Sequence, residues 1–189
     1  MATKLRRRYK RVLHKSLKKL LSAQQILYTP HESELIMIKD AYAQVKKEHP
    51  ILPEFDKINH EFELELIEQE AFLLRQIKRK IGEKFEPVLD LFESILNPDT
   101  NSFSDMYECR CLTNGEKKTL LDVYRHLMEQ YRLIMETDVI GDDKLDAETI
   151  RKIYDLWQQE KKQIAPLMKK IRECWQKHFE PKEILEYLG

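Results

Sequence analysis

The densest group of side chains that could do chemistry lies at the start of the chain. Residues 1–31 hold nine Lys and Arg residues and no Asp or Glu, because the first acidic residue is Glu32. Guanidinium and ammonium groups at this density neutralise phosphates and release bound counterions, so they predict salt-dependent binding of a polyanion. The predicted anion-binding residues are Arg6, Arg7, Arg8, Lys10, Arg11, Lys15, Lys18 and Lys19.

Charge is distributed unevenly along the chain. The whole sequence has 33 basic and 33 acidic residues and a formal net charge of zero. Residues 32–189 hold 24 of the basic residues and all 33 acidic ones, a net charge of −9. We therefore distinguish a basic segment (residues 1–31) from an acidic body (residues 32–189). The predicted partner is anionic and is contacted through residues 4–19, either a nucleic acid or an acidic protein surface.

The basic segment has other interpretations, which the sequence leaves open. A cationic amphipathic helix can lie on an anionic lipid surface. The segment is also similar to a mitochondrial presequence, because it is amphipathic, rich in Arg and free of acid. It can equally be an ordinary bundle helix whose basic face is solvated or touches the acidic body. Among external partners, we favour nucleic acid over lipid.

A second pair of residues could do acid–base chemistry near the end of the chain. Arg172 and His178 resemble the Arg-x(4–6)-His pattern of HEPN ribonucleases, which are themselves helical bundles. The resemblance implies metal-free RNA cleavage, with His178 moving a proton and Arg172 beside the phosphate. Two features of this sequence differ from the family pattern. Glu173 follows Arg172, where that family commonly has a small polar residue or His. In addition, residues six positions apart lie about 240° apart around a regular helix, so Arg172 and His178 would not share a face. We therefore expect the match of Arg172 and His178 to this pattern to be a coincidence.

An acidic cluster also resembles known metal motifs. Asp142-Asp143-Lys144-Leu145-Asp146 matches the Asp-Asp-x-x-Asp of prenyl-chain synthases, which bind magnesium diphosphate. The stretch 138–149 is similar to a calcium loop, but it has Asp143 in place of the central Gly and Thr149 in place of the final Glu. We expect a structural role instead, with Asp146 as the N-cap of a helix.

The sequence predicts no metal site, no cofactor and no catalytic activity. None of the six His residues has a Glu three positions before it, and four Gly residues cannot build a phosphate-binding loop. Three Cys residues are few and odd in number, so we expect free thiols in a reducing compartment. Cys109 and Cys111 are too close together for an ordinary zinc pair. The expected location is intracellular and cytoplasmic, with mitochondrial import left open by the acid-free N-terminus.

Apolar residues recur every three or four positions over most of the chain, which predicts helices. The expected helices cover 4–28, 32–48, 54–96, Thr113 to about 137, Asp146 to Phe179, and a final turn over 182–188. Gly82 and Pro87 predict a kink or break between 82 and 87, and Pro166 predicts another. Thr113 and Glu116 have the spacing of a capping box.

These helices predict an all-α fold, an antiparallel up-and-down bundle of five or six helices with no β-sheet. We expect a single domain over 1–189, with 97–115 an irregular loop and no membrane-spanning segment. The predicted function is a non-enzymatic helical interaction module whose basic segment binds an anionic partner. The alternative is a protein-binding scaffold with a helical partner or a second copy of itself, and the third possibility is the metal-free ribonuclease.

Overall fold

The computed structural model describes residues 32–67 and 71–176, and in this part of the chain all regular structure is helical, with no strand. The all-α prediction is therefore confirmed for these residues. The predicted helix over 4–28 and the final turn over 182–188 lie outside them. The elements are α2 (Glu32–Glu48), α3 (Phe55–Phe62), the short 3-10 helix η1 (Leu64–Leu66), α4 (Leu73–Leu96), α5 (Phe103–Cys111), α6 (Asn114–Ile140) and α7 (Asp143–Trp175).

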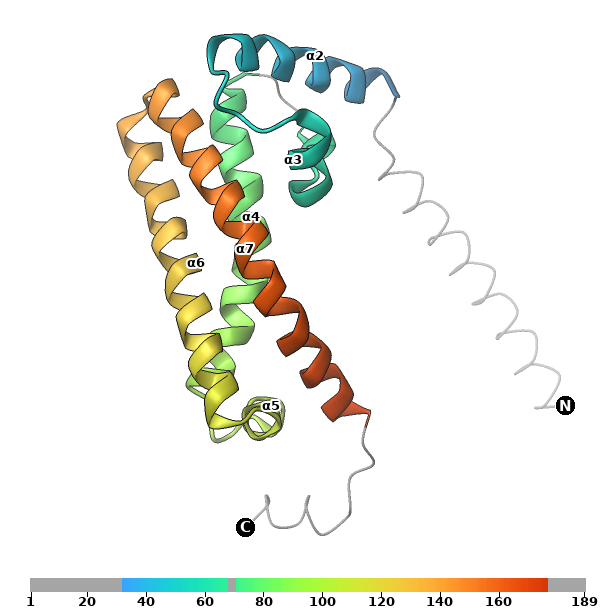
Figure 1. Cartoon of the computed structure of the whole chain (residues 1–189), viewed down its shortest axis with the longest axis vertical. Helices are drawn as coiled ribbons and strands as arrows, with labels where there is room; N and C mark the ends of the chain where they lie inside the picture. The colour runs from blue at the N-terminus through green and yellow to red at the C-terminus, as the bar shows by residue number, and fades with distance from the viewer. Residues whose placement is uncertain (1–31, 68–70, 177–189) are drawn as a thin grey trace, which may run out of the picture.

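Three long helices form the bundle. Figure 1 shows α4 and α7 running in one direction and α6 running in the opposite direction beside them. Helices α2 and α3 gather at one end of the bundle, and α5 lies at the other end. The connections are short, and only Gly141 and Asp142 separate α6 from α7. Such short links force consecutive helices to be antiparallel, which gives the predicted up-and-down arrangement.

The core lies where the apolar faces of the three long helices meet. The apolar residues on each face recur every three or four positions, as the sequence predicted. A fully buried aliphatic or aromatic side chain contributes about 1.5–3 kcal/mol relative to an exposed one, so these faces supply most of the packing energy. The side chains with no exposed surface include Ile77, Ile81, Phe85, Phe92 and Ile95 from α4, Leu120, Val123 and Leu127 from α6, and Ile150 and Ile153 from α7.

Two helices close one end of this core. The prediction for 32–48 is confirmed as α2, where Tyr42 is 1% exposed and its hydroxyl donates to the carbonyl of Pro53 at 2.8 Å. Burial raises the pKa of Tyr42 above its ordinary value. Helix α3 is tied to α7, because the indole Nε1 of Trp157 donates to Glu61 at 2.8 Å.

The prediction of one long helix over 54–96, broken near Pro87, is wrong. The break lies at 63–72, where Glu63 (φ 54°) and Phe72 (φ 57°) adopt the left-handed conformation that ends one helix and precedes the next. Helix α4 continues through Pro87. Because Pro87 and Glu83 are both exposed, water can satisfy the Glu83 carbonyl that loses its amide partner. Helix α7 likewise continues through the exposed Pro166, where a kink or division was predicted.

The region 97–115 is not the irregular loop that was predicted, because residues 103–111 form α5. Ser102 caps this helix by accepting a hydrogen bond from the amide of Asp105 at 3.4 Å. Helix α6 then begins as predicted, with the complete capping box of Thr113 and Glu116. The gap of 138–145 between the two predicted helices is reduced to residues 141–142, because α6 extends to Ile140 and α7 begins at Asp143.

Candidate functional site

The predicted anion-binding site lies outside the described residues. Its members are Arg6, Arg7, Arg8, Lys10, Arg11, Lys15, Lys18 and Lys19, all within 1–31. The assignment of these eight residues to an anionic partner therefore stays a prediction from their type and spacing. The described residues show instead the body to which this segment is attached.

The predicted nuclease pair is only half within the described residues. Arg172 is exposed in the last turn of α7, and His178 lies outside the described residues. The neighbouring Glu173 forms an ion pair with Lys169, with the Nζ and Oε1 atoms 3.7 Å apart. A carboxylate at this position would oppose an incoming phosphate.

The acidic cluster has a structural role, although not the predicted one. The N-cap of α7 is Asp142, whose side chain accepts from the amide of Leu145 at 2.7 Å, so the expectation that Asp146 caps the helix is wrong. Helix α6 ends at Ile140 with Gly141 in the left-handed conformation, which leaves Asp142 as the first residue able to cap α7. Asp138 lies inside α6, so the residues do not form a calcium loop.

Asp146 instead neutralises a buried lysine. Lys78 on α4 has no exposed surface, and its ammonium lies 2.5 Å from the carboxylate of Asp146 on α7. It also donates to the hydroxyl of Thr137 on α6 at 3.0 Å. A buried charge is tolerated only when it is paired and hydrogen-bonded, so the three helices must supply these groups together. Asp138, 3.8 Å from the same ammonium, adds a second negative charge at the edge of the cluster.

A second buried carboxylate lies between α6 and α7. Glu160 is 3% exposed, and its Oε1 atom lies 2.7 Å from Nδ1 of His126, whose side chain is half exposed. The amide of Gln163 donates weakly to the other oxygen at 3.5 Å. The His126–Glu160 pair links α6 to α7. No third His, Cys, Asp or Glu joins it in the described residues to make a cluster able to hold a metal ion.

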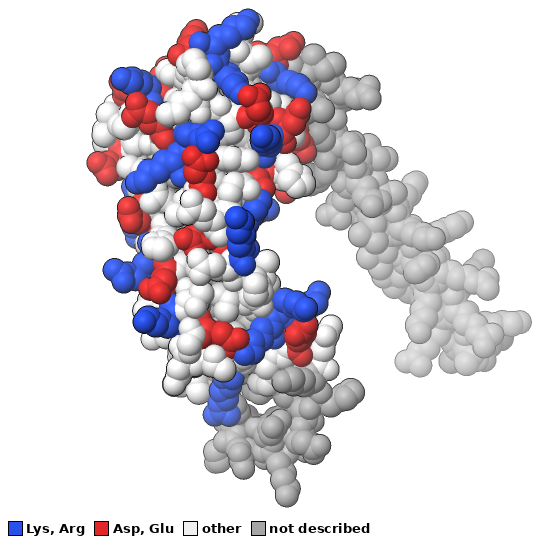
Figure 2. Space-filling view, viewed as in Figure 1, with Lys and Arg blue, Asp and Glu red and all other residues white. Residues whose placement is uncertain are grey.

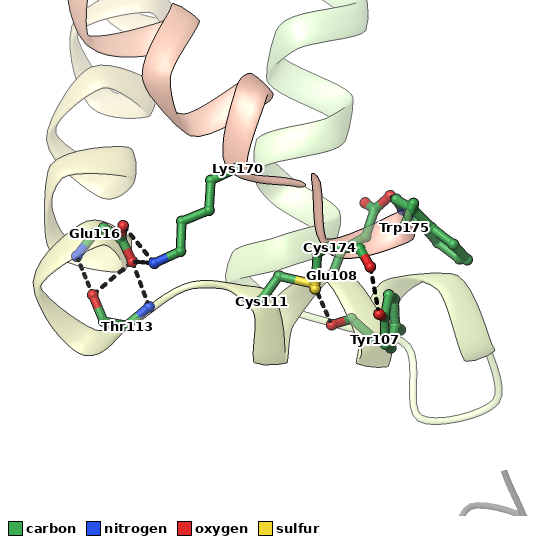
Figure 3. Close-up of a disulfide and its surroundings, with 8 residues drawn as sticks. All are labelled: Tyr107, Glu108, Cys111, Thr113, Glu116, Lys170, Cys174 and Trp175. Atoms are coloured by element: carbon green, nitrogen blue, oxygen red, sulfur yellow. Dashed lines mark hydrogen bonds and ion pairs between the residues drawn. A yellow bond between two sulfur atoms is a disulfide. The ribbon is translucent and has the colours of Figure 1, made fainter. Parts of the chain in front are cut away.

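The expectation that all cysteines are free thiols is wrong. Cys111 at the end of α5 and Cys174 in the last turn of α7 form a disulfide, with Cα atoms 6.0 Å apart (Figure 3). Cys109 remains a thiol and accepts a hydrogen bond from Lys117 at 3.2 Å. The topology explains the pairing, because α7 is antiparallel to α6 and therefore ends beside the residues that precede α6.

Aromatic and polar groups surround this disulfide. The hydroxyl of Tyr107 donates to the carbonyl of Cys174 at 2.8 Å, and the indole of Trp175 donates to Glu108 at 2.7 Å (Figure 3). The rings of Tyr107 and Trp175 have centroids 4.8 Å apart, and Phe103 stacks on Tyr107 at 5.8 Å. The Phe103–Tyr107 stack lies within α5, and the other contacts join α5 to the last turn of α7. We call this set of residues the α5–α7 junction.

An ion pair lies next to the junction. Glu116 in the first turn of α6 completes the Thr113 capping box and also contacts Lys170 of α7, with the Nζ and Oε1 atoms 2.6 Å apart. The Lys170 hydrogen bond, followed by those from Thr113, lowers the pKa of Glu116 to about 2. The carboxylate is therefore charged throughout the neutral range, which suits its place at a helix N-terminus.

Comparison of the chain with protein families, with curated proteins and with solved structures finds no match. None of the helices in the described residues is both long enough and apolar enough to cross a membrane. Function must therefore be inferred from the charges and contacts of this chain alone.

Proposed function

We propose that this chain is a non-enzymatic helical interaction module whose basic segment binds nucleic acid by sequence-independent charge pairing. The observation that carries the proposal is the nine-to-zero excess of basic over acidic residues in 1–31. Contacts between cationic side chains and phosphates provide affinity and position without reading base identity. The helical bundle would be the platform that carries this segment.

The charge of the body supports assigning the contact to the basic segment. Residues 32–189 have a net charge of −9, so the body as a whole repels a polyanion. Figure 2 shows Lys and Arg interspersed with Asp and Glu over the visible face of the described residues. Several of the cations are already paired with carboxylates, as Arg151 is with Asp155 at 2.7 Å. Such a mixed surface offers a phosphate backbone little net attraction.

The sequence pattern of the basic segment favours nucleic acid over lipid. Its apolar residues would form a narrow stripe on a helix, while the cationic residues would cover a broad face. A narrow stripe buries little surface in a bilayer, whereas a broad cationic face can reach several phosphates at once. The same stripe is long enough to pack on a protein surface while the charges remain in water.

Charge reversal with a matched control tests this proposal. The test variant and the control each change five basic residues to Glu, so their net charges are equal. Fluorescence anisotropy with a labelled single-stranded RNA and a duplex DNA measures binding at about 50 mM and about 200 mM salt. The test variant is R6E/R7E/R8E/K10E/R11E, and the control is R79E/K84E/K118E/K144E/K162E, whose five positions are exposed on α4, α6 and α7.

We expect the test variant to lose at least about tenfold in affinity and to show a shallower salt dependence, because each phosphate contact contributes about 0.9 to the logarithmic slope. The control should bind more strongly than the test variant. Equal affinities for the two variants, or no binding by the wild type at low salt, would contradict the proposal. Preferential binding to anionic vesicles would identify lipid as the partner instead.

Two further measurements address the other functions that the sequence left open. Light scattering after size exclusion would show a stable oligomer if the chain is a scaffold, and a scaffold would ignore polyanions. A nuclease assay on the wild type and on His178→Ala tests the HEPN-like pair. RNA cleavage lost in that variant would replace the proposal with an enzymatic one.

A further inference from the structure

Helix α5 is attached to the bundle differently from the other helices. None of its residues is buried, whereas every other helix longer than one turn within 32–67 and 71–176 contributes buried residues to the core. The first buried side chain after it is Leu112, which follows the helix. Helix α5 touches α4 and α7, and the Cys111–Cys174 disulfide is its covalent link to α7 in addition to the main chain. The position of α5 therefore depends on the junction rather than on apolar burial.

The end of α7 also lacks buried residues. Ile171 is the last buried residue of the helix, and the five described residues after it are exposed or half-buried. The disulfide, the Tyr107 hydrogen bond and the Trp175 hydrogen bond all fall within Cys174 and Trp175 (Figure 3). One covalent bond thus sits at the centre of the contacts that join two weakly anchored segments.

We propose that the Cys111–Cys174 disulfide is a reversible redox latch. In the oxidised state it holds α5 against the last turn of α7, and in the reduced state both segments separate from the bundle. The reductant is a dithiol, whose first thiolate attacks one cysteine sulfur and displaces the other as a thiolate. The second thiol then closes a disulfide in the reductant. Two electrons and two protons pass to the protein, leaving Cys111 and Cys174 as thiols.

The surroundings of the disulfide allow this exchange. Cys111 and Cys174 are both half-buried rather than buried, so a small dithiol can approach the end of the bundle. The α4–α6–α7 core does not depend on the latch, because Leu120 and Ile164 are buried and Glu116 remains bound to Lys170 beside the junction. Opening the latch should therefore release α5 locally and leave the bundle folded.

The first experiment establishes the oxidation state. The full chain contains three cysteines, of which only Cys109 is a thiol in this structure. Maleimide labelling of the denatured protein should find one thiol after incubation with glutathione disulfide and three after dithiothreitol. Peptide mapping should show Cys111 linked to Cys174. Three thiols after incubation with the oxidant, or a different linkage, would overturn the proposal.

The second experiment tests whether the bond controls α5. Hydrogen exchange of the full chain is compared with and without dithiothreitol. Reduction should speed exchange over 103–111 and 172–176 at least about tenfold, while the centres of α4 and α6 stay protected. Cys111→Ser and Cys174→Ser should exchange like the reduced wild type under both conditions. Cys109→Ser is the matched control and should still respond to the reductant.

A fluorescence measurement gives an independent readout. In a Trp157→Phe background, Trp175 is the single tryptophan and lies beside Tyr107. Its emission should shift when dithiothreitol opens the latch and should return on reoxidation. If the disulfide forms but neither the exchange over 103–111 nor the Trp175 emission changes on reduction, the bond is a static cross-link and the latch is refuted.

Discussion

Lys78 shows how one residue can fix the arrangement of three helices. The apolar faces of α4, α6 and α7 attract each other without direction, so alternative registers can bury similar area. An ammonium with no exposed surface removes that freedom, because it must meet Asp146 of α7 and Thr137 of α6 at once. Buried polar groups of this kind can specify one arrangement at some cost in stability. We assign this role to the Lys78 cluster.

Removing one partner of the cluster should be far more harmful than removing both. Lys78→Met leaves Asp146 buried without its cation, and we expect the free energy of unfolding to fall by about 3–5 kcal/mol. The double variant Lys78→Met/Asp146→Leu removes both charges and should recover most of that loss. Urea unfolding measures the free energy of unfolding of the single and the double variant. If the free energy of unfolding of Lys78→Met lay within about 1 kcal/mol of the wild-type value, the Lys78–Asp146 pair would not be the constraint we describe.

At the level of elements, the sequence predicted the apolar faces of the long helices and the starts of α2 and α6, but not the starts of α4, α5 and α7. Thr113 and Glu116 mark the start of α6 because both halves of the capping box lie within four residues. The end of α3 and the start of α4 were not predicted, because the apolar residues between them also recur at helical spacing. Leu64, Ile67 and Leu74 are buried on what resembles a second face of one helix, but the chain has instead changed direction.

The disulfide was missed for a related reason. Cys111 and Cys174 are 63 residues apart, and neither has a local pattern that indicates a partner. The antiparallel order of α6 and α7 nevertheless requires the residue before α6 to lie near the end of α7. The predicted topology could thus have brought the two cysteines together. The buried pairing of Lys78 with Asp146 could not be found this way, because helical periodicity does not identify the partner of a charged residue.

The ion pair of Glu116 in α6 with Lys170 in α7, next to the α5–α7 junction, should be sensitive to acid. The Lys170 hydrogen bond holds the pKa of Glu116 at about 2, below the ordinary value of 4.5. A carboxyl whose pKa is lowered by folding stabilises the protein above the ordinary value, and the contribution is lost as the pH falls toward the folded value. The wild type should therefore be more stable than Glu116→Gln above pH 4.5, and the difference should shrink between pH 4.5 and about 2.

Urea unfolding at a series of pH values measures this difference. Lys170→Met is the matched variant, because it removes the cation that contributes most to the shift while leaving the capping box. It should lose much of the same acid-sensitive stability. If the difference in free energy of unfolding between the wild type and Glu116→Gln stayed constant as the pH fell, Glu116 would not be the source of the acid sensitivity.

At the scale of the whole molecule, the chain separates its charges along the sequence rather than across a folded surface. The body has a net charge of −9 and paired cations, while the basic segment contributes nine positive charges and no negative ones. A neutral total therefore conceals two parts that respond to a polyanion in opposite ways. If binding depends on charge pairing by the basic segment, the body should weaken the interaction rather than add to it.

A peptide of residues 1–31 should consequently bind RNA or DNA at least as tightly as the full chain. The advantage should be largest near 0.01 M salt, where the screening length is about 30 Å, and should vanish near 0.15 M, where it is about 8 Å. Anisotropy titrations of the peptide and the full chain across this range measure the ratio. A peptide weaker than the full chain at every salt concentration would instead place part of the binding surface on the body.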